Sequence, residues 1–232
     1  MADSNPQLPA DRPSLLLPAA VVAVLVIFFG FRATGSEAVD FAVQSLFWDG
    51  RDWLVPKDAG WPHQVAYTGP KVLIYLFALW LMWVMAFPSA SPTWMGRRRA
   101  AYIFASVALT TLICTQLRDY TSMATPRGLL LYGGRWEHLL LFETKPLGYP
   151  SNAFPAGHAS GGFGLLCLAF AWPQVRTCRL GLLAALLIGG WMGLYQMARG
   201  EHFLSHTLVT AALAWLVAAA LARAMRPADL AS

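Results

Sequence analysis

Charged residues are scarce in this chain, and their scarcity decides its broad class. Only 12% of the 232 residues are charged and 57% are hydrophobic, whereas an ordinary soluble domain has about 25% charged residues. This composition is typical of a membrane protein. The net charge is +5, but the basic residues are scattered or lie beside apolar runs and form no basic, aromatic surface. We therefore do not expect nucleic acid as a partner.

Cysteine is also rare, which argues against a framework of disulfides. The chain has three cysteines, an odd number, and two of them, Cys114 and Cys167, lie inside apolar runs. We interpret these two as small core residues rather than as metal ligands.

What the chain has instead is a series of long apolar runs. None of them alternates in the way of a barrel strand, so each predicts a helix that satisfies its own backbone hydrogen bonds in lipid. The prediction is an all-α membrane protein with six transmembrane helices in one domain, residues 15–226, between terminal segments 1–14 and 227–232. The six runs are Leu15–Phe31, Val72–Phe87, Ala100–Leu117, Ala159–Trp172, Leu180–Met197 and Thr207–Ala222.

Basic residues in the short connectors predict how the helices are oriented. The sequence "GRRR" (Gly96 to Arg99) lies in one connector, Arg176 and Arg179 lie in another, and Arg223 and Arg226 follow the last run. All fall on one side, which the positive-inside rule makes cytoplasmic. We therefore predict a multi-pass protein of the bacterial inner membrane with both termini in the cytoplasm. The two long segments 32–71 and 118–158 are then outside.

Two stretches near the N-terminus allow more than one interpretation. The first run resembles the apolar part of a cleaved signal peptide, but the leader before it holds Asp3, Asp11 and only one arginine, so a retained span is favoured. The aromatic stretch Phe41–Pro56 predicts a helix lying on the outer leaflet.

Polar residues from distant parts of the chain meet at the predicted outer face. Arg118 ends the third run, His158 opens the fourth, and Arg199, His202 and His206 lie between the fifth and sixth. Two guanidinium groups and three imidazoles at three helix ends predict a pocket for an anion, since ionisable groups at membrane segments are functional by default.

The local spacing of these residues adds chemical detail. His202 and His206 are four apart, so on a helix one imidazole can orient the other by a hydrogen bond. His158 follows Gly157 at a helix start, where free backbone N–H groups favour a phosphate-like anion.

In order, these segments resemble the three motifs of the type 2 phosphatidic acid phosphatase superfamily, a family of integral membrane lipid phosphatases. "RDYTSMATP" (Arg118 to Pro126) resembles the motif Lys, six residues, Arg-Pro, with Thr125 in the Arg place. "PAGH" (Pro155 to His158) resembles Pro-Ser-Gly-His, with Ala156 for Ser. "YQMARGEHFLSH" (Tyr195 to His206) resembles Ser-Arg, five residues, His, three residues, Asp, with Gln196 for Arg and His206 for Asp.

The resemblance implies a six-helix bundle that acts through a phosphohistidine, without a metal or cofactor. His202 would attack phosphorus, His206 would orient it, and His158 would serve as acid and then base. Phosphate-binding groups would be Arg118, Arg199, the backbone at Gly157 and, to compensate for the missing guanidinium groups, Arg127 and Lys145. Arg127 and Lys145 are otherwise solvated residues or contacts to lipid headgroups.

The substrate class implied is a lipid phosphate, for example phosphatidic acid, phosphatidylglycerophosphate, a polyprenyl (pyro)phosphate or a lipid A phosphate. Two alternatives stay open: a lipid phosphotransferase that uses the same site, and a non-catalytic lipid-binding or transport protein. A metal or haem bound by His158, His202 and His206 is a further alternative. His63 and His138, which lack a partner pattern, are interpreted as surface residues, and "ASGGFG" (Ala159 to Gly164) as a helix-packing face.

Overall fold

The fold is a bundle of helices. A computed structural model describes residues 13–57, 60–150 and 153–227, so the predicted terminal segments 1–14 and 227–232 lie almost wholly outside it. The described residues form no strand, only two isolated bridges. The α-helices are α1 (Leu16–Gly30), α2 (Glu37–Gln44), α3 (Trp61–His63), α4 (Gly69–Ala86), α5 (Arg97–Tyr120), α6 (Gly157–Gly164), α7 (Val175–Ala198) and α8 (Leu204–Met225). A π-helical segment, Gln64–Thr68, precedes α4, and 3-10 segments are Arg32–Thr34, Pro88–Ala90, Pro126–Gly128, Leu130–Tyr132 and Leu165–Phe170.

All six predicted apolar runs are helical, but only four are long and apolar enough to cross a membrane by themselves. These are Gln64–Ala86, Arg97–Tyr120, Val175–Ala198 and Leu204–Met225. Leu16–Gly30 and Gly157–Phe170 are shorter apolar helices, and the second changes from α-helix to 3-10 helix at Leu165. The chain is a multi-pass membrane protein, while the count of six full spans goes beyond what these lengths establish.

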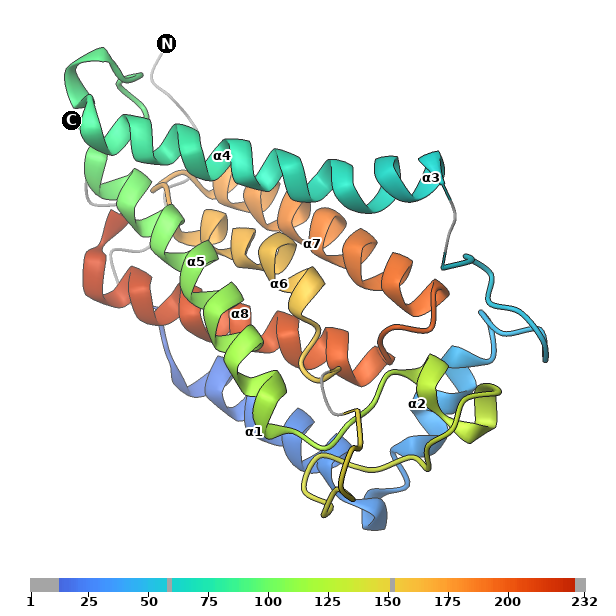
Figure 1. Cartoon of the computed structure of the whole chain (residues 1–232). Coiled ribbons are helices and arrows are strands. Elements are labelled where there is room, and N and C mark those ends of the chain that lie inside the picture. Colours follow the sequence, from blue (N-terminus) through green and yellow to red (C-terminus); the bar gives the residue numbers. More distant parts are fainter. Residues whose placement is uncertain (1–12, 58–59, 151–152, 228–232) are drawn as a thin grey trace.

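The short helix α6 lies at the centre of the bundle. It contacts α4, α5, α7 and α8, and α1 packs against α8 on the outside (Figure 1). α1 begins and α8 ends at the same end of the bundle, whereas α2 and the segments 121–150 and 153–156 lie at the opposite end (Figure 1). The loops that carry the predicted site therefore gather at one end.

Small residues allow α6 to approach its neighbours closely. A Cβ atom on Gly162 would lie 2.7 Å from the Cα of Gly189 on α7, and one on Gly164 would lie 2.9 Å from the Cα of Val107 on α5. Such contacts between backbones are possible only where glycine is present. The predicted packing face Ala159–Gly164 is confirmed.

The three cysteines are free and buried. Cys114 lies on α5 and Cys167 in the segment after α6, both fully buried in the bundle. The interpretation of Cys114 and Cys167 as small core residues is confirmed.

The predicted interfacial helix over Phe41–Pro56 is wrong, because α2 ends at Gln44. The Oδ1 atom of Asp49 accepts hydrogen bonds from the backbone N–H groups of Arg51 and Asp52, and Gly50 adopts φ of 98°. This Asp-Gly turn reverses the chain where the aromatic pattern predicted a continuing helix.

Helix α2 attaches to the outer end of the bundle by buried polar contacts. Gln44 Nε2 donates to the carbonyl of Met197 at the end of α7, 2.8 Å away. The backbone N–H of Ser205, in the first turn of α8, donates to Asp40 Oδ1 over 2.9 Å. Burial raises the pKa of Asp40 to about 6. Asp40 thus caps α8 from a distant part of the chain, immediately beside the predicted histidine pair.

Candidate active site

A tight turn between α7 and α8 positions the two predicted catalytic histidines. Gly200 has φ of 71°, and a Cβ atom there would lie 2.5 Å from the ring of Trp53. Arg127 holds the turn from outside: its backbone N–H donates to the carbonyl of Gly200 and its Nε to the carbonyl of Arg199, at 2.8 and 3.0 Å. The chain therefore reverses within a few residues and delivers His202 to the start of α8.

His202 and His206 form a buried pair. Their Nδ1 atoms are 3.4 Å apart, so one ring donates and the other accepts. His202 is 2% exposed and His206 0%. The Nε2 atom of His202 is buried and has no hydrogen-bond partner among the described residues. Burial, and then the charge of neighbouring His158, lower the pKa of His202 to about 3. His202 is therefore a neutral imidazole with one nitrogen engaged and the other unbonded.

His158 and Arg118 lie next to this pair. The ring centroid of His158, the second residue of α6, is 5.9 Å from that of His202. Arg118, in the last turn of α5, lies against the start of α6: its Nη1 is 3.2 Å from the position of a Cβ on Gly157. Glycine at position 157 thus lets the guanidinium lie beside the backbone that carries His158.

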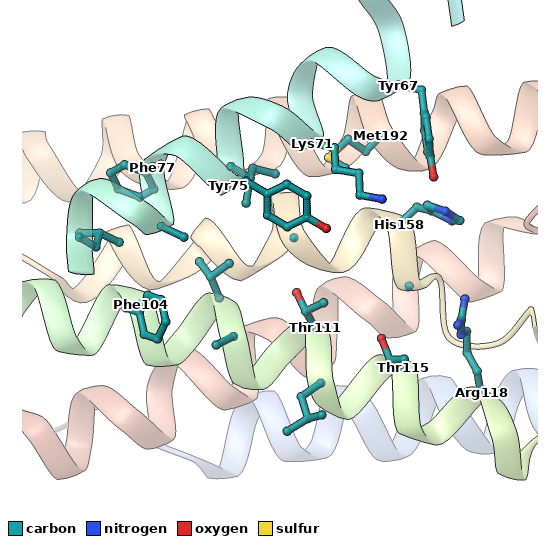
Figure 2. Close-up of a pocket in the computed structure, with 18 residues that line it drawn as sticks. Tyr67, Lys71, Tyr75, Phe77, Phe104, Thr111, Thr115, Arg118, His158 and Met192 are labelled. Carbon is teal, nitrogen blue, oxygen red and sulfur yellow. The ribbon is translucent and has the colours of Figure 1, made fainter. Parts of the chain in front are cut away.

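A cavity of about 560 Å³ opens from His158 and Arg118 and runs between α4 and α5 toward the middle of the bundle (Figure 2). His202 does not line it, although its ring is next to that of His158. Away from His158 the lining is largely apolar, from Ile74, Phe77, Leu81, Phe104, Val107 and Leu112, among others. The cavity is thus polar and cationic at one end and fit for hydrocarbon along its length.

Two residues at this polar end escaped the sequence analysis, Tyr67 and Lys71. Lys71 lines the cavity beside His158 (Figure 2). The ring of Tyr67 lies 5.1 Å from that of His158 and 4.7 Å from that of His63, and the Arg199 guanidinium carbon lies 6.0 Å from its centroid. Tyr67 belongs to the π-helical segment, a distortion often found at functional sites. The available signal was a lysine at the outer end of an apolar run.

The other predicted phosphate-binding residues take different positions. Arg199 is buried, donates from Nη2 to the carbonyl of Lys57 at 3.1 Å and does not line the cavity. Arg127 faces the Arg199 carbonyl and lies 3.8 Å from the carboxylate of Glu201. Lys145 is exposed in the outer segment and does not line the cavity either. The predicted residues that line one space are thus Arg118, Gly157 and His158. His202 and His206 lie next to His158 but not in the lining, and Arg199, Arg127 and Lys145 do not line the cavity.

The two remaining histidines are not free surface residues. The side chain of His138 is 10% exposed and its Nδ1 lies 2.9 Å from the carboxylate of Glu37 on α2, so its interpretation as a surface residue is wrong. Burial lowers the pKa of His138, and hydrogen bonding to Glu37 opposes that shift. His63 is half-buried, with Nδ1 at 3.1 Å from the Tyr195 hydroxyl. Both contacts join segments more than 100 residues apart.

Comparison with known proteins agrees with the motifs. The sequence model of the PAP2 superfamily matches residues 99–229, more than half of the chain. The chain belongs to the PAP2 superfamily. The resemblance read from the motifs is thereby confirmed, and at the level of the family this membership supports a membrane lipid phosphatase. No curated protein sequence matches this member significantly.

Comparison with solved structures gives the same fold for this PAP2 protein. The crystal structure of a transmembrane PAP2-type phosphatidylglycerolphosphate phosphatase from Bacillus subtilis aligns with a TM-score of 0.56 over 88% of this chain and 93% of that one. The two sequences are 16% identical. The alignment therefore supports the helical-bundle fold.

Proposed function

We propose that this protein is a lipid-phosphate phosphatase that works through a phosphohistidine on His202. The observation that carries the proposal is the state of that imidazole. It is buried and neutral, its Nδ1 is engaged by His206, and its Nε2 is unbonded. A nucleophile needs this combination of an oriented ring and a free lone pair.

In the proposed first step, a phosphate monoester or pyrophosphate enters between Arg118 and His158, and His202 Nε2 attacks phosphorus. The P–O bond to the lipid breaks, and His158, which the negative charge of the bound phosphate keeps protonated, transfers its proton to the departing oxygen. His206 holds Nδ1 while the ring becomes positively charged. Arg118 and the backbone at Gly157 stabilise the phosphoryl oxygens.

In the second step, His158 takes a proton from a water molecule that attacks the phosphorylated imidazole. The P–N bond breaks, orthophosphate leaves, and His202 returns to its neutral form. No metal enters either step. Among the described residues, no three His, Cys, Asp or Glu side chains form a cluster suited to a metal ion.

The cavity supports a lipid as substrate. Its apolar lining runs from His158 between α4 and α5, where a chain of CH₂ groups gains about 0.8 kcal/mol for each group removed from water. A phosphate ester of an acyl or prenyl lipid fits a space that is cationic at one end and apolar along its length.

We further propose that the site faces the periplasm from the inner membrane, with both termini cytoplasmic. The support is the density of arginine in the short connectors at the other end of the bundle. A green fluorescent protein fused after Ser232 tests the orientation in a bacterial host. Fluorescence is expected, and a periplasmic alkaline phosphatase fusion that is active at the same position would overturn it.

The activity is tested with purified protein in detergent, lipid phosphates of the four classes named above, and EDTA throughout. Orthophosphate release that disappears in His202→Ala is expected. Label transferred from one lipid to another instead of to water would make the protein a phosphotransferase. No turnover by the wild type, with equal lipid binding by the wild type and His202→Ala, would favour a non-catalytic lipid-binding protein. Activity that EDTA abolishes would support a metal site.

A further inference from the structure

The site lacks two of the family's cations, and the residues at those positions do not replace them. Thr125 stands where the family has one arginine and does not line the cavity. Gln196 stands where it has another, is buried, and accepts a hydrogen bond from Arg199 through its Oε1 at 3.4 Å. Among the described residues of the lining, Arg118 is then the one that carries a guanidinium, so a phosphate there lacks positive charge on its other side.

Lys71 supplies a cation on that other side. It lies in the first turn of α4, across the cavity from Arg118 on α5, and its side chain points toward His158 (Figure 2). Its Nζ lies 5.9 Å from the ring centroid of Tyr67 and 5.8 Å from that of Tyr75. These tyrosines are four residues before and after Lys71, so the ammonium group is held between two aromatic rings of its own helix.

The charged residues that line the cavity favour an anionic ligand. Among the described residues that line the cavity, Lys71 and Arg118 are the ones with a permanent charge, and none carries a carboxylate. Within the part of the chain that the structure describes, neither forms a salt bridge. The Nε of Arg118 is buried without a hydrogen-bond partner among those same residues. Two unpaired cations in a largely apolar cavity are costly unless a ligand supplies the opposite charge.

We infer that Lys71 is a phosphate-binding residue of this site, contributed by a helix outside the region 99–229 that the family model matches. It and Arg118 contact the phosphoryl oxygens from opposite walls, and Tyr67 and Tyr75 position the ammonium. The inference rests on the proposed function and adds to it the residue that takes over from the missing guanidinium groups. Lysine suits this place because its compact charge needs no planar partner.

The test compares Lys71→Met with Lys71→Arg. Methionine keeps the length and apolar stem of the side chain without its charge. Arg51→Ala, a substitution at an outer residue whose side chain is 93% exposed, is the control. Two quantities are measured for each variant: kcat/KM on a lipid phosphate, and inhibition by inorganic phosphate and orthovanadate, which need no lipid. Thermal midpoints in detergent show whether each variant is folded.

Loss of one hydrogen bond to a charged group predicts a decrease in kcat/KM of about 10- to 150-fold in Lys71→Met. Inhibition by both anions should weaken by a similar factor, Lys71→Arg should recover most of both, and Arg51→Ala should match the wild type. Unchanged kcat/KM and unchanged anion inhibition in Lys71→Met would overturn the inference. The proposed phosphatase activity would still stand if the wild type is active and His202→Ala is not. Loss of activity with unchanged anion inhibition would overturn it too, since that pattern fits a structural role. If the wild type is inactive, binding of orthovanadate by wild type and Lys71→Met, measured by thermal shift, decides the inference separately.

Discussion

The replacement of the family's aspartate by His206 leads to a prediction about how the nucleophile is supported. His206 meets His202 through Nδ1, at 3.4 Å. When His202 attacks phosphorus its ring becomes positively charged, and the contact changes from a neutral hydrogen bond to a charge-assisted one. A hydrogen bond to a charged group is worth about 1.5–3 kcal/mol. Removal of the acceptor in His206→Leu should therefore lower kcat by about 10- to 150-fold.

The geometry also predicts which polar substitutions succeed. The amide of asparagine reaches the position of an imidazole Nδ1, whereas that of glutamine reaches the position of Nε2. His206→Asn should keep much of the activity, and His206→Gln should resemble His206→Leu. The assay is single-turnover release of orthophosphate from a labelled lipid phosphate, with thermal midpoints to confirm folding. Equal activity of folded His206→Asn and His206→Leu would refute the role of the Nδ1 contact.

Three further predictions concern stability, pH and the turn before His202. Gly162→Ala should lower stability by about 1–3 kcal/mol because its Cβ would strike the backbone of α7, whereas Gly190→Ala, with open space around it, should leave the thermal midpoint in detergent unchanged. Because the pKa of Asp40 is raised from 3.8 to about 6, the folded state holds the proton of Asp40 more tightly than the unfolded state does. Stability should therefore fall by up to about 3 kcal/mol as pH rises from about 4 to 6. Asp40→Asn should flatten the plot of thermal midpoint against pH in this range, and an unchanged slope would contradict the prediction. Arg127→Ala removes the donor that holds the Arg199 carbonyl, and steady-state kinetics should show a lower kcat with little change in KM.

The membrane helices could be predicted from the sequence because their signal is local and long. Each apolar run became a helix within a few residues of its expected ends, as in α1 and α8. The count of full spans could not be established in the same way, since α6 gives way to a 3-10 segment after eight residues. Hydrophobicity marks where lipid or core lies, and it carries little information on how tightly the helix is wound.

The convergence of the site could be predicted only where motifs marked it. The motifs included Arg118, His158 and His202, and these three residues do lie close together. No motif included Lys71, because its proposed role depends on α4 lying opposite α5 across a shared cavity. The burial of His138 likewise depends on α2, whose Glu37 contacts His138 although the two residues are 101 positions apart in the sequence. The turn after α2 was different: its signal, Asp49-Gly50, is present in the sequence, within the aromatic stretch that predicted a continuing helix.

The most direct test of the proposed mechanism is detection of the phosphorylated enzyme. A lipid phosphate labelled with ³²P is mixed with the wild type, and the reaction is quenched within the first turnover in alkali, where phosphohistidine is stable. The mechanism predicts label that is released by acid and that maps to the peptide containing His202, and no label in His202→Ala. Label retained in His202→Ala, or turnover by the wild type without any acid-labile phosphate on His202, would contradict it.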